Sequence, residues 1–255
     1  MVSLQLRDSM HANRQAESIE VHHHQPLRSD VWLTLQTRYA QLLVRGRDTK
    51  GKPPIVGLIA FADRLRVIWH AAGANDPFAD WWLIKTHDAI AAVDSRIKHE
   101  RDALRQLADQ NGAFVAVPAQ MREPFRIKLQ FASPYAYKAA QMLAQFDAFA
   151  CESLTARHIG SVTRKRCVAN IHSVASRIRG VFNIPMRFRH LGIDRDDPTS
   201  WQAKGETAQQ FMGQIPIDVL KGSRRAAFAP PIVLGEEESV PPVFEIENGM
   251  EGFDL

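Results

Sequence analysis

The sequence predicts a mainly α-helical protein that contains one short antiparallel β-ribbon. Residues 31–37 and 125–131 each alternate apolar and polar side chains, which is the period of a half-buried strand. Most of the chain between residues 38 and 212 instead repeats apolar side chains at the spacing of helices. With 255 residues, of which 45% are apolar, the chain is long enough to bury a full core.

The first ribbon strand reads VWLTLQT, residues 31–37. Leu33 and Leu35 define an apolar face, whereas Trp32, Thr34 and Gln36 lie on the other face. The helix that follows is expected to end at Gly46, because glycine readily adopts the backbone conformation of a helix C-cap.

Two further helices are predicted over residues 55–72 and 78–110. The second has a narrow apolar stripe and a charged middle, so we expect it to pack as a long arm on another helix. The aromatic cluster of Phe78, Trp81 and Trp82 at its start is more simply core than a partner surface.

The second ribbon strand, residues 125–131, leads directly into a helix over residues 134–158. Ser133 is the expected N-cap and Pro134 the first helical residue, where the missing N–H costs nothing. A second helix over residues 163–182 follows, with Thr163 as its cap. The two strands can pair within one chain, or between two chains as a homodimer, and the sequence leaves both open.

Charge is segregated along the chain. Seven of the 28 acids follow residue 231, so residues 1–225 carry all 32 bases with 21 acids, a net charge of +11. Residues 153–193 hold eight bases and no acid. Generic solvated surfaces mix both signs, so this stretch indicates a polyanion partner.

A β-ribbon indicates double-stranded DNA as the polyanion, because a two-stranded ribbon fits the major groove and reads base edges with its outward side chains. The predicted base-reading residues are Thr34, Gln36, Arg126, Lys128 and Gln130. A helix N-terminus rich in bases binds phosphate, although its dipole disfavours cations otherwise. The predicted phosphate-binding residues are Ser161, Thr163, Arg164, Lys165 and Arg166.

No catalytic, metal or cofactor motif is found, so we expect neither an enzyme nor a cofactor. Cys151 and His158 are two helical turns apart, too far for a nucleophile and base in direct contact, and Cys151 and Cys167 are expected to be buried and reduced. A nuclease has only Asp194, Asp196 and Asp197 as candidates. Asp197 is more simply the cap of a helix over residues 198–212.

Several segments resemble the AcaB-like family of conjugative plasmids and integrating conjugative elements. They are residues 27–47 (LRSDVWLTLQTRYAQLLVRGR), 76–82 (DPFADWW), 129–143 (LQFASPYAYKAAQML), 146–160 (FDAFACESLTARHIG), 192–197 (GIDRDD) and 223–231 (SRRAAFAPP). The resemblance implies a transcriptional regulator of conjugative transfer with a ribbon-helix-helix-like DNA-binding unit. For such a regulator, the transcription machinery is a candidate further partner. The helix over residues 134–158 is about twice the length that such units use.

The expected organisation is a disordered arm (1–27), a mostly helical DNA-binding domain (28–231) and an acidic flexible tail (232–255). No apolar run of membrane-spanning length or signal core is present, so a cytoplasmic protein without membrane contact is expected. The alternative to a DNA-binding regulator is a non-enzymatic scaffold of the conjugation or integrating-element machinery. That scaffold would bind protein through the long helix and the Trp cluster.

Overall fold

The computed structural model describes residues 30–47, 51, 53–109 and 117–233. The predicted arm and nearly all of the predicted acidic tail lie outside these residues. The fold below is that of the described residues from Val31 onward. Its elements are β1 (Val31–Leu35), α1 (Arg38–Arg45), α2 (Leu58–Gly73), α3 (Pro77–Asp109), β2 (Phe125–Leu129), α4 (Pro134–His158), α5 (Arg164–Asn183), the 3-10 turn η1 (Pro185–Arg187), α6 (Pro198–Met212) and α7 (Ile217–Leu220).

The fold class is confirmed as mainly α-helical with one two-stranded antiparallel sheet in the described residues. β1 and β2 pair within one chain, with Leu33 opposite Ile127 and Leu35 opposite Phe125. Both strands end two residues earlier than the alternating pattern suggested. The ribbon is therefore complete without a second chain.

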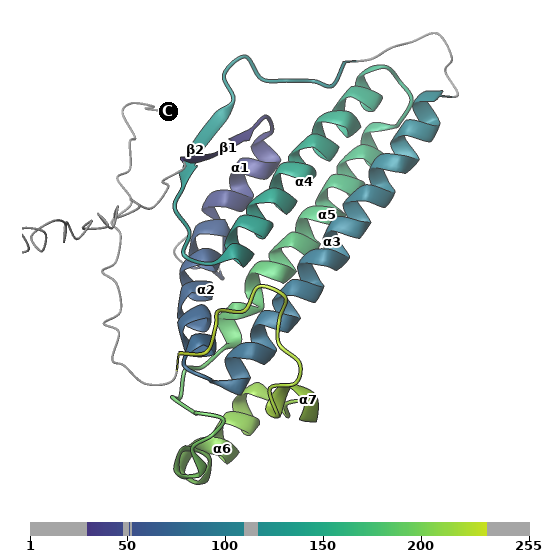
Figure 1. The fold of residues 1–255 in the computed structure, drawn as a ribbon. Helices are drawn as coiled ribbons and strands as arrows, with labels where there is room; N and C mark the ends of the chain where they lie inside the picture. Colours follow the sequence, from purple (N-terminus) through teal and green to yellow (C-terminus); the bar gives the residue numbers. More distant parts are fainter. Residues whose placement is uncertain (1–29, 48–50, 52, 110–116, 234–255) are drawn as a thin grey trace, which may run out of the picture. The chain divides into compact units, whose positions relative to one another are not determined.

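The long helices α3, α4 and α5 lie side by side, and α4 and α5 run antiparallel after a short turn (Figure 1). α1 and α2 pack against α4 and complete the core. The predicted packing of the long helix over residues 78–110 is confirmed, because α3 packs against α4 and α5 along its apolar stripe. Phe78 and Trp82 are buried and Trp81 packs against the core, which confirms the core interpretation of that cluster.

Two glycines fix the turn between α1 and α2. Gly46 caps α1 with a φ of 69°, and a Cβ atom there would lie 2.2 Å from the Ile55 carbonyl oxygen. A Cβ on Gly57 would lie 2.4 Å from Gly46 N. Arg47 and Ile55 exchange two backbone hydrogen bonds, of 2.8 and 2.7 Å, between the two ends of this turn. Because Ile55 pairs with Arg47, α2 begins at Leu58 and not at residue 55.

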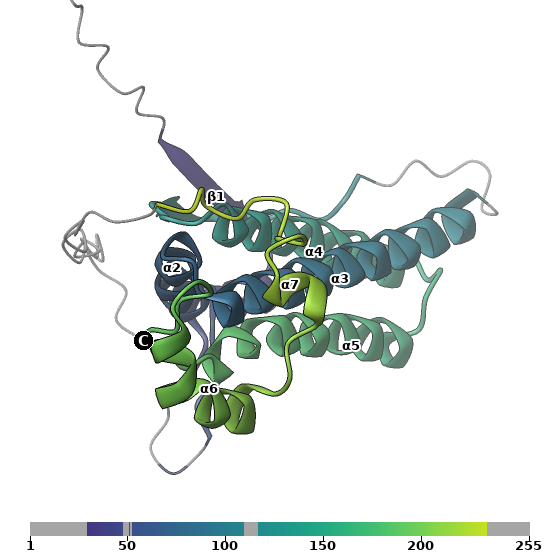
Figure 2. The same cartoon turned by 60° about the horizontal axis from the view of Figure 1, so that its bottom comes forward.

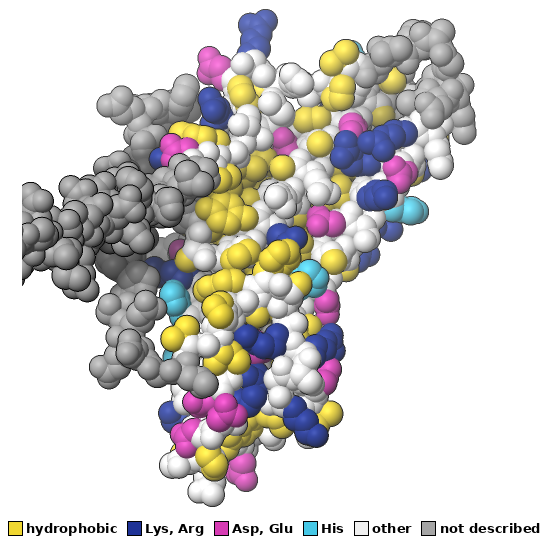
Figure 3. Space-filling model, viewed as in Figure 1, with side chains coloured by type: hydrophobic (Ala, Val, Ile, Leu, Met, Phe, Trp, Pro, Cys, Tyr) yellow, Lys and Arg dark blue, Asp and Glu magenta, His cyan; other side chains and the backbone are white. Residues whose placement is uncertain are grey.

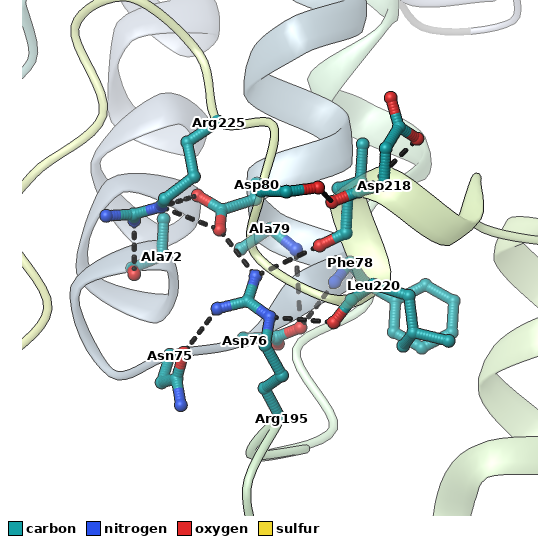
Figure 4. Close-up of polar contacts among 12 residues, drawn as sticks. Ala72, Asn75, Asp76, Phe78, Ala79, Asp80, Arg195, Asp218, Leu220 and Arg225 are labelled. Atoms are coloured by element: carbon teal, nitrogen blue, oxygen red, sulfur yellow. Dashed lines mark hydrogen bonds and ion pairs between the residues drawn. The ribbon is translucent and has the colours of Figure 1, made fainter.

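A buried ion-pair network holds the C-terminal segment against the start of α3 (Figure 4). Asp80 is fully buried and accepts hydrogen bonds from Arg195 Nη2 at 2.7 Å and from Arg225 Nε at 2.9 and 3.0 Å. Arg225 also donates to the Ala72 carbonyl at 2.9 Å, at the end of α2. Three sequence segments that carry the family resemblance, 76–82, 192–197 and 223–231, therefore meet at one structural joint.

Candidate nucleic-acid interface

The outward face of the ribbon gathers most of the predicted base-reading side chains. Thr34 lies opposite Arg126, and Trp32 lies opposite Lys128. All four are exposed, whereas Leu33, Leu35 and Leu129 on the opposite face are buried. Alternation has thus divided the ribbon into a buried face and a face of basic, hydroxyl and aromatic side chains.

Asp147 fixes the ribbon on α4. Asp147 is 4% exposed, and its carboxylate accepts hydrogen bonds from Gln36 N at 2.6 Å, Thr37 N at 2.8 Å and Thr37 Oγ1 at 2.6 Å. Thr37 Oγ1 in turn accepts a hydrogen bond from Ala40 N at 3.2 Å and caps α1. One buried carboxylate therefore ends β1, starts α1 and joins both to the middle of α4.

The two predicted glutamines lie at different places. Gln130 follows β2 directly and is exposed. Gln36 has left the strand, and its side-chain Oε1 accepts a hydrogen bond from Met121 N at 3.1 Å. Gln36 therefore holds the segment before β2, and an amide with this partner is a weaker candidate for base reading than Gln130.

The helix that follows β2 begins as its sequence predicted. Ser133 Oγ accepts a hydrogen bond from Tyr135 N at 3.3 Å, and Pro134 is the first residue of α4. The Tyr137 hydroxyl accepts a hydrogen bond from Phe131 N at 3.2 Å, which holds the end of the strand against the first turn of the helix.

An apolar hollow lies beside this strand-to-helix junction. It has a volume of about 350 Å³, and its lining includes Phe131, Pro134, Tyr137 and Phe228. Figure 3 shows hydrophobic side chains gathered on this face, over the start of α4. Lys138 Nζ lies 4.5 Å from the centroid of the Phe228 ring, so a cation borders the hollow.

The predicted phosphate-binding residues are placed together at the start of α5. Thr163 Oγ1 caps the helix by accepting a hydrogen bond from Arg166 N at 3.3 Å. Arg164, Lys165 and Arg166 are exposed in the first turn, which contains no acid. Ser161 N donates to the Ala156 carbonyl at 2.9 Å in the turn that joins α4 to α5.

The structure does not bring this basic turn next to the ribbon. The ribbon joins α4 at Asp147, and α5 begins beyond the far end of α4, as both views show (Figures 1 and 2). His158 lies eleven positions after Asp147, which is about 16 Å along a helix axis. The base-reading and phosphate-binding sets are therefore two patches.

The side chains considered as a nucleophile or as nuclease ligands take part in contacts of the fold itself. Cys151 is buried, and desolvation raises the pKa of its thiol to about 11, so the thiolate is scarce at neutral pH. Asp194 and Asp196 accept hydrogen bonds from Asn75 Nδ2, each at 2.9 Å. Asp197 caps α6, as predicted. Among the described residues, no group of His, Cys, Asp and Glu has an arrangement that could hold a metal ion.

The chain matches the model of a known protein family over most of its length. A family model described as transcriptional regulator AcaB matches residues 24–233. The chain belongs to the AcaB family of transcriptional regulators. The match spans both ribbon strands and the ion pairs at Asp80.

The fold of this AcaB-family chain is also similar to a solved structure, the crystal structure of selenomethionine-containing AcaB from uropathogenic E. coli. The TM-score is 0.53 at 15% sequence identity, and the match covers 78% of this chain and 97% of that chain. No similar protein was found in the comparison with curated proteins. Within the described residues, no helix combines the length and apolar character that crossing a membrane requires.

Two side chains beside the ribbon were not predicted as site residues, Trp32 on its outward face and Arg45 at its opposite face. Trp32 shares the outward face, and its place in the period-two pattern beside Thr34 was the signal that could have identified it. Arg45, in the last turn of α1, lies with its guanidinium carbon 5.3 Å from the centroid of the Phe125 ring. Only the fold brings Arg45 to β2, so no local pattern could have indicated it.

Proposed function

We propose that this AcaB-family regulator binds duplex DNA sequence-specifically by placing the outward face of its ribbon in the major groove. The observation that carries the proposal is an anchored two-stranded ribbon whose exposed face holds Thr34, Arg126 and Lys128. Arg and Lys suit guanine, and Thr suits either an acceptor or a thymine methyl group. The resemblance to AcaB-like proteins supports target promoters that control conjugative transfer of a mobile element.

One chain supplies a complete ribbon in this proposal. β1 leads into α1 through the Thr37 cap, and β2 leads into α4 through the Ser133 cap, so each strand has its own following helix. This arrangement is a ribbon-helix-helix-like unit within one polypeptide. A homodimer is therefore not required to build the reading face, and dimerisation on DNA would instead double the length of the site that is read.

The basic start of α5 is proposed to grip phosphates of the same duplex. The end of α4 lies about 16 Å along the helix axis from Asp147, and α5 begins six residues after that end. That length of α4 is less than one turn of B-DNA, which is about 34 Å. Phosphate contacts fix register and carry no sequence information. The ribbon and the start of α5 should therefore contribute differently to affinity and specificity.

Equilibrium titrations of a selected duplex and a scrambled duplex, at several salt concentrations, test this division. Lys128→Ala or Gln130→Ala should cost about 1–3 kcal/mol on the selected duplex and relax its preference over the scrambled one. Arg164→Ala or Lys165→Ala should weaken binding to both duplexes and lower the salt slope by about one unit each. Lys98→Ala, an exposed base of α3, is the matched control. Unchanged affinity in all four test variants refutes the proposal.

The scaffold function loses its main support. Phe78 and Trp82 are buried and the stripe of α3 packs against α4 and α5, so neither is available to a partner.

A further inference from the structure

Trp32 is a large apolar side chain that lies outside the hydrophobic core. Its side chain is 50% exposed, and it lies on the ribbon face opposite to the buried Leu33 and Leu35. It is not among the side chains that form or pack against the hydrophobic core. Trp is enriched on surfaces that a partner covers, because its large apolar ring contributes strongly to binding.

Its neighbours indicate what kind of partner covers it. The guanidinium carbon of Arg126 lies 5.3 Å from the centroid of the indole ring, within the range of a cation–π contact. Lys128 lies directly opposite Trp32, and Thr34 lies opposite Arg126. The indole is therefore an exposed apolar group that is surrounded by hydrogen-bonding side chains. An apolar protein partner would leave the Arg126 guanidinium buried without an acceptor, which is costly.

In the DNA major groove the apolar feature of the base edges is the thymine 5-methyl group. We infer that Trp32 is a specificity-determining residue that contacts a thymine methyl group beside the guanine contacted by Arg126. This inference rests on the proposed function. Trp32 and Arg126 are diagonal neighbours on the two strands. Such pairs are about 7–8 Å apart, close to two base-pair steps, so the thymine and guanine lie within about two base pairs.

The contact with Arg126 gives Trp32 a second role, as a positioning residue. A ring below the guanidinium limits its rotation, and less freedom is then lost when the guanidinium forms its paired hydrogen bonds to guanine. Trp32→Phe keeps an apolar ring for both the methyl group and the guanidinium, whereas Trp32→Ala removes both contacts.

Deoxyuridine scanning isolates the methyl contact. Each thymine of the selected duplex is replaced in turn by deoxyuridine, which lacks only the 5-methyl group, and the dissociation constant is measured for each variant. At one position we expect wild-type protein to bind about fourfold more weakly, as one methyl group returns to water. Trp32→Phe should keep most of this penalty and Trp32→Ala should lose it.

Thr34→Ala is the matched control, because threonine can also contact a thymine methyl group. The inference is overturned if the deoxyuridine penalty persists in Trp32→Ala, if it disappears in Thr34→Ala alone, or if no thymine gives a penalty in the wild type. Arg126→Ala and Lys128→Ala separate this outcome from failure of the proposed function. If both variants bind like the wild type, the ribbon is not the interface. If both lose affinity but the deoxyuridine penalty does not depend on Trp32, only the present inference fails.

Discussion

Asp147 gives the sharpest test of how the ribbon is held. Asp147→Ala leaves Thr37 N and Thr37 Oγ1 buried without their acceptor, and it also removes the acceptor of Gln36 N, which is only partly buried. Each buried donor left unpaired costs about 1–3 kcal/mol. The free energy of unfolding should therefore fall by about 2–6 kcal/mol, because water can replace the carboxylate only at Gln36.

Urea unfolding followed by circular dichroism measures this loss. Asp63→Ala, which removes an exposed acid of α2, is the control and should change the free energy of unfolding by less than about 0.5 kcal/mol. Where Asp147→Ala remains folded at low temperature, its affinity for duplex DNA should also fall, since the ribbon has lost its attachment to α4. An unfolding free energy as close to wild type as that of Asp63→Ala refutes the reasoning.

Two further predictions concern stability. Burial raises the pKa of Asp76 to about 7, so between about pH 4 and pH 7 the native state binds more protons than the unfolded state. The free energy of unfolding should fall as pH rises through this interval. Asp76→Asn, which keeps an oxygen that can accept from Phe78 N, should remove that dependence in urea titrations at pH 4.5, 6 and 8. Wild-type behaviour from this variant would contradict the burial argument. Gly46→Ala should lower the free energy of unfolding by about 1–3 kcal/mol, because the added Cβ would lie 2.2 Å from the Ile55 carbonyl oxygen. Gly160→Ala shares the positive φ without a steric contact and should cost less in the same assay; an equal cost would show that the clash is relieved.

Features encoded by a few adjacent residues could be predicted from the sequence. Ser133 with Pro134 marks the start of α4, Gly46 marks the end of α1, and Asp197 marks the start of α6. In each case the residue satisfies backbone groups of its own helix terminus, so the signal is local. The two alternating segments likewise predicted which side chains face outward, because the period of two is independent of the pairing partner.

Contacts between distant segments could not be predicted in this way. Asp147 reaches Thr37 across 110 residues, and Arg225 reaches Asp80 across 145. Such pairs depend on how the helices pack, and an isolated Asp or Arg in a helical pattern gives no sign of its partner. The separation of the α5 basic turn from the ribbon has the same origin, because it depends on where along α4 the ribbon is attached.

The central claim is that the exposed face of the ribbon reads DNA sequence. Selection of duplexes from a random pool, performed in parallel with wild-type protein and with Lys128→Ala, tests it most directly. The account predicts that wild-type protein enriches one motif and that the variant loses preference at one or two adjacent positions of that motif. Enrichment of no motif by the wild type, or of an identical motif by both proteins, would contradict it.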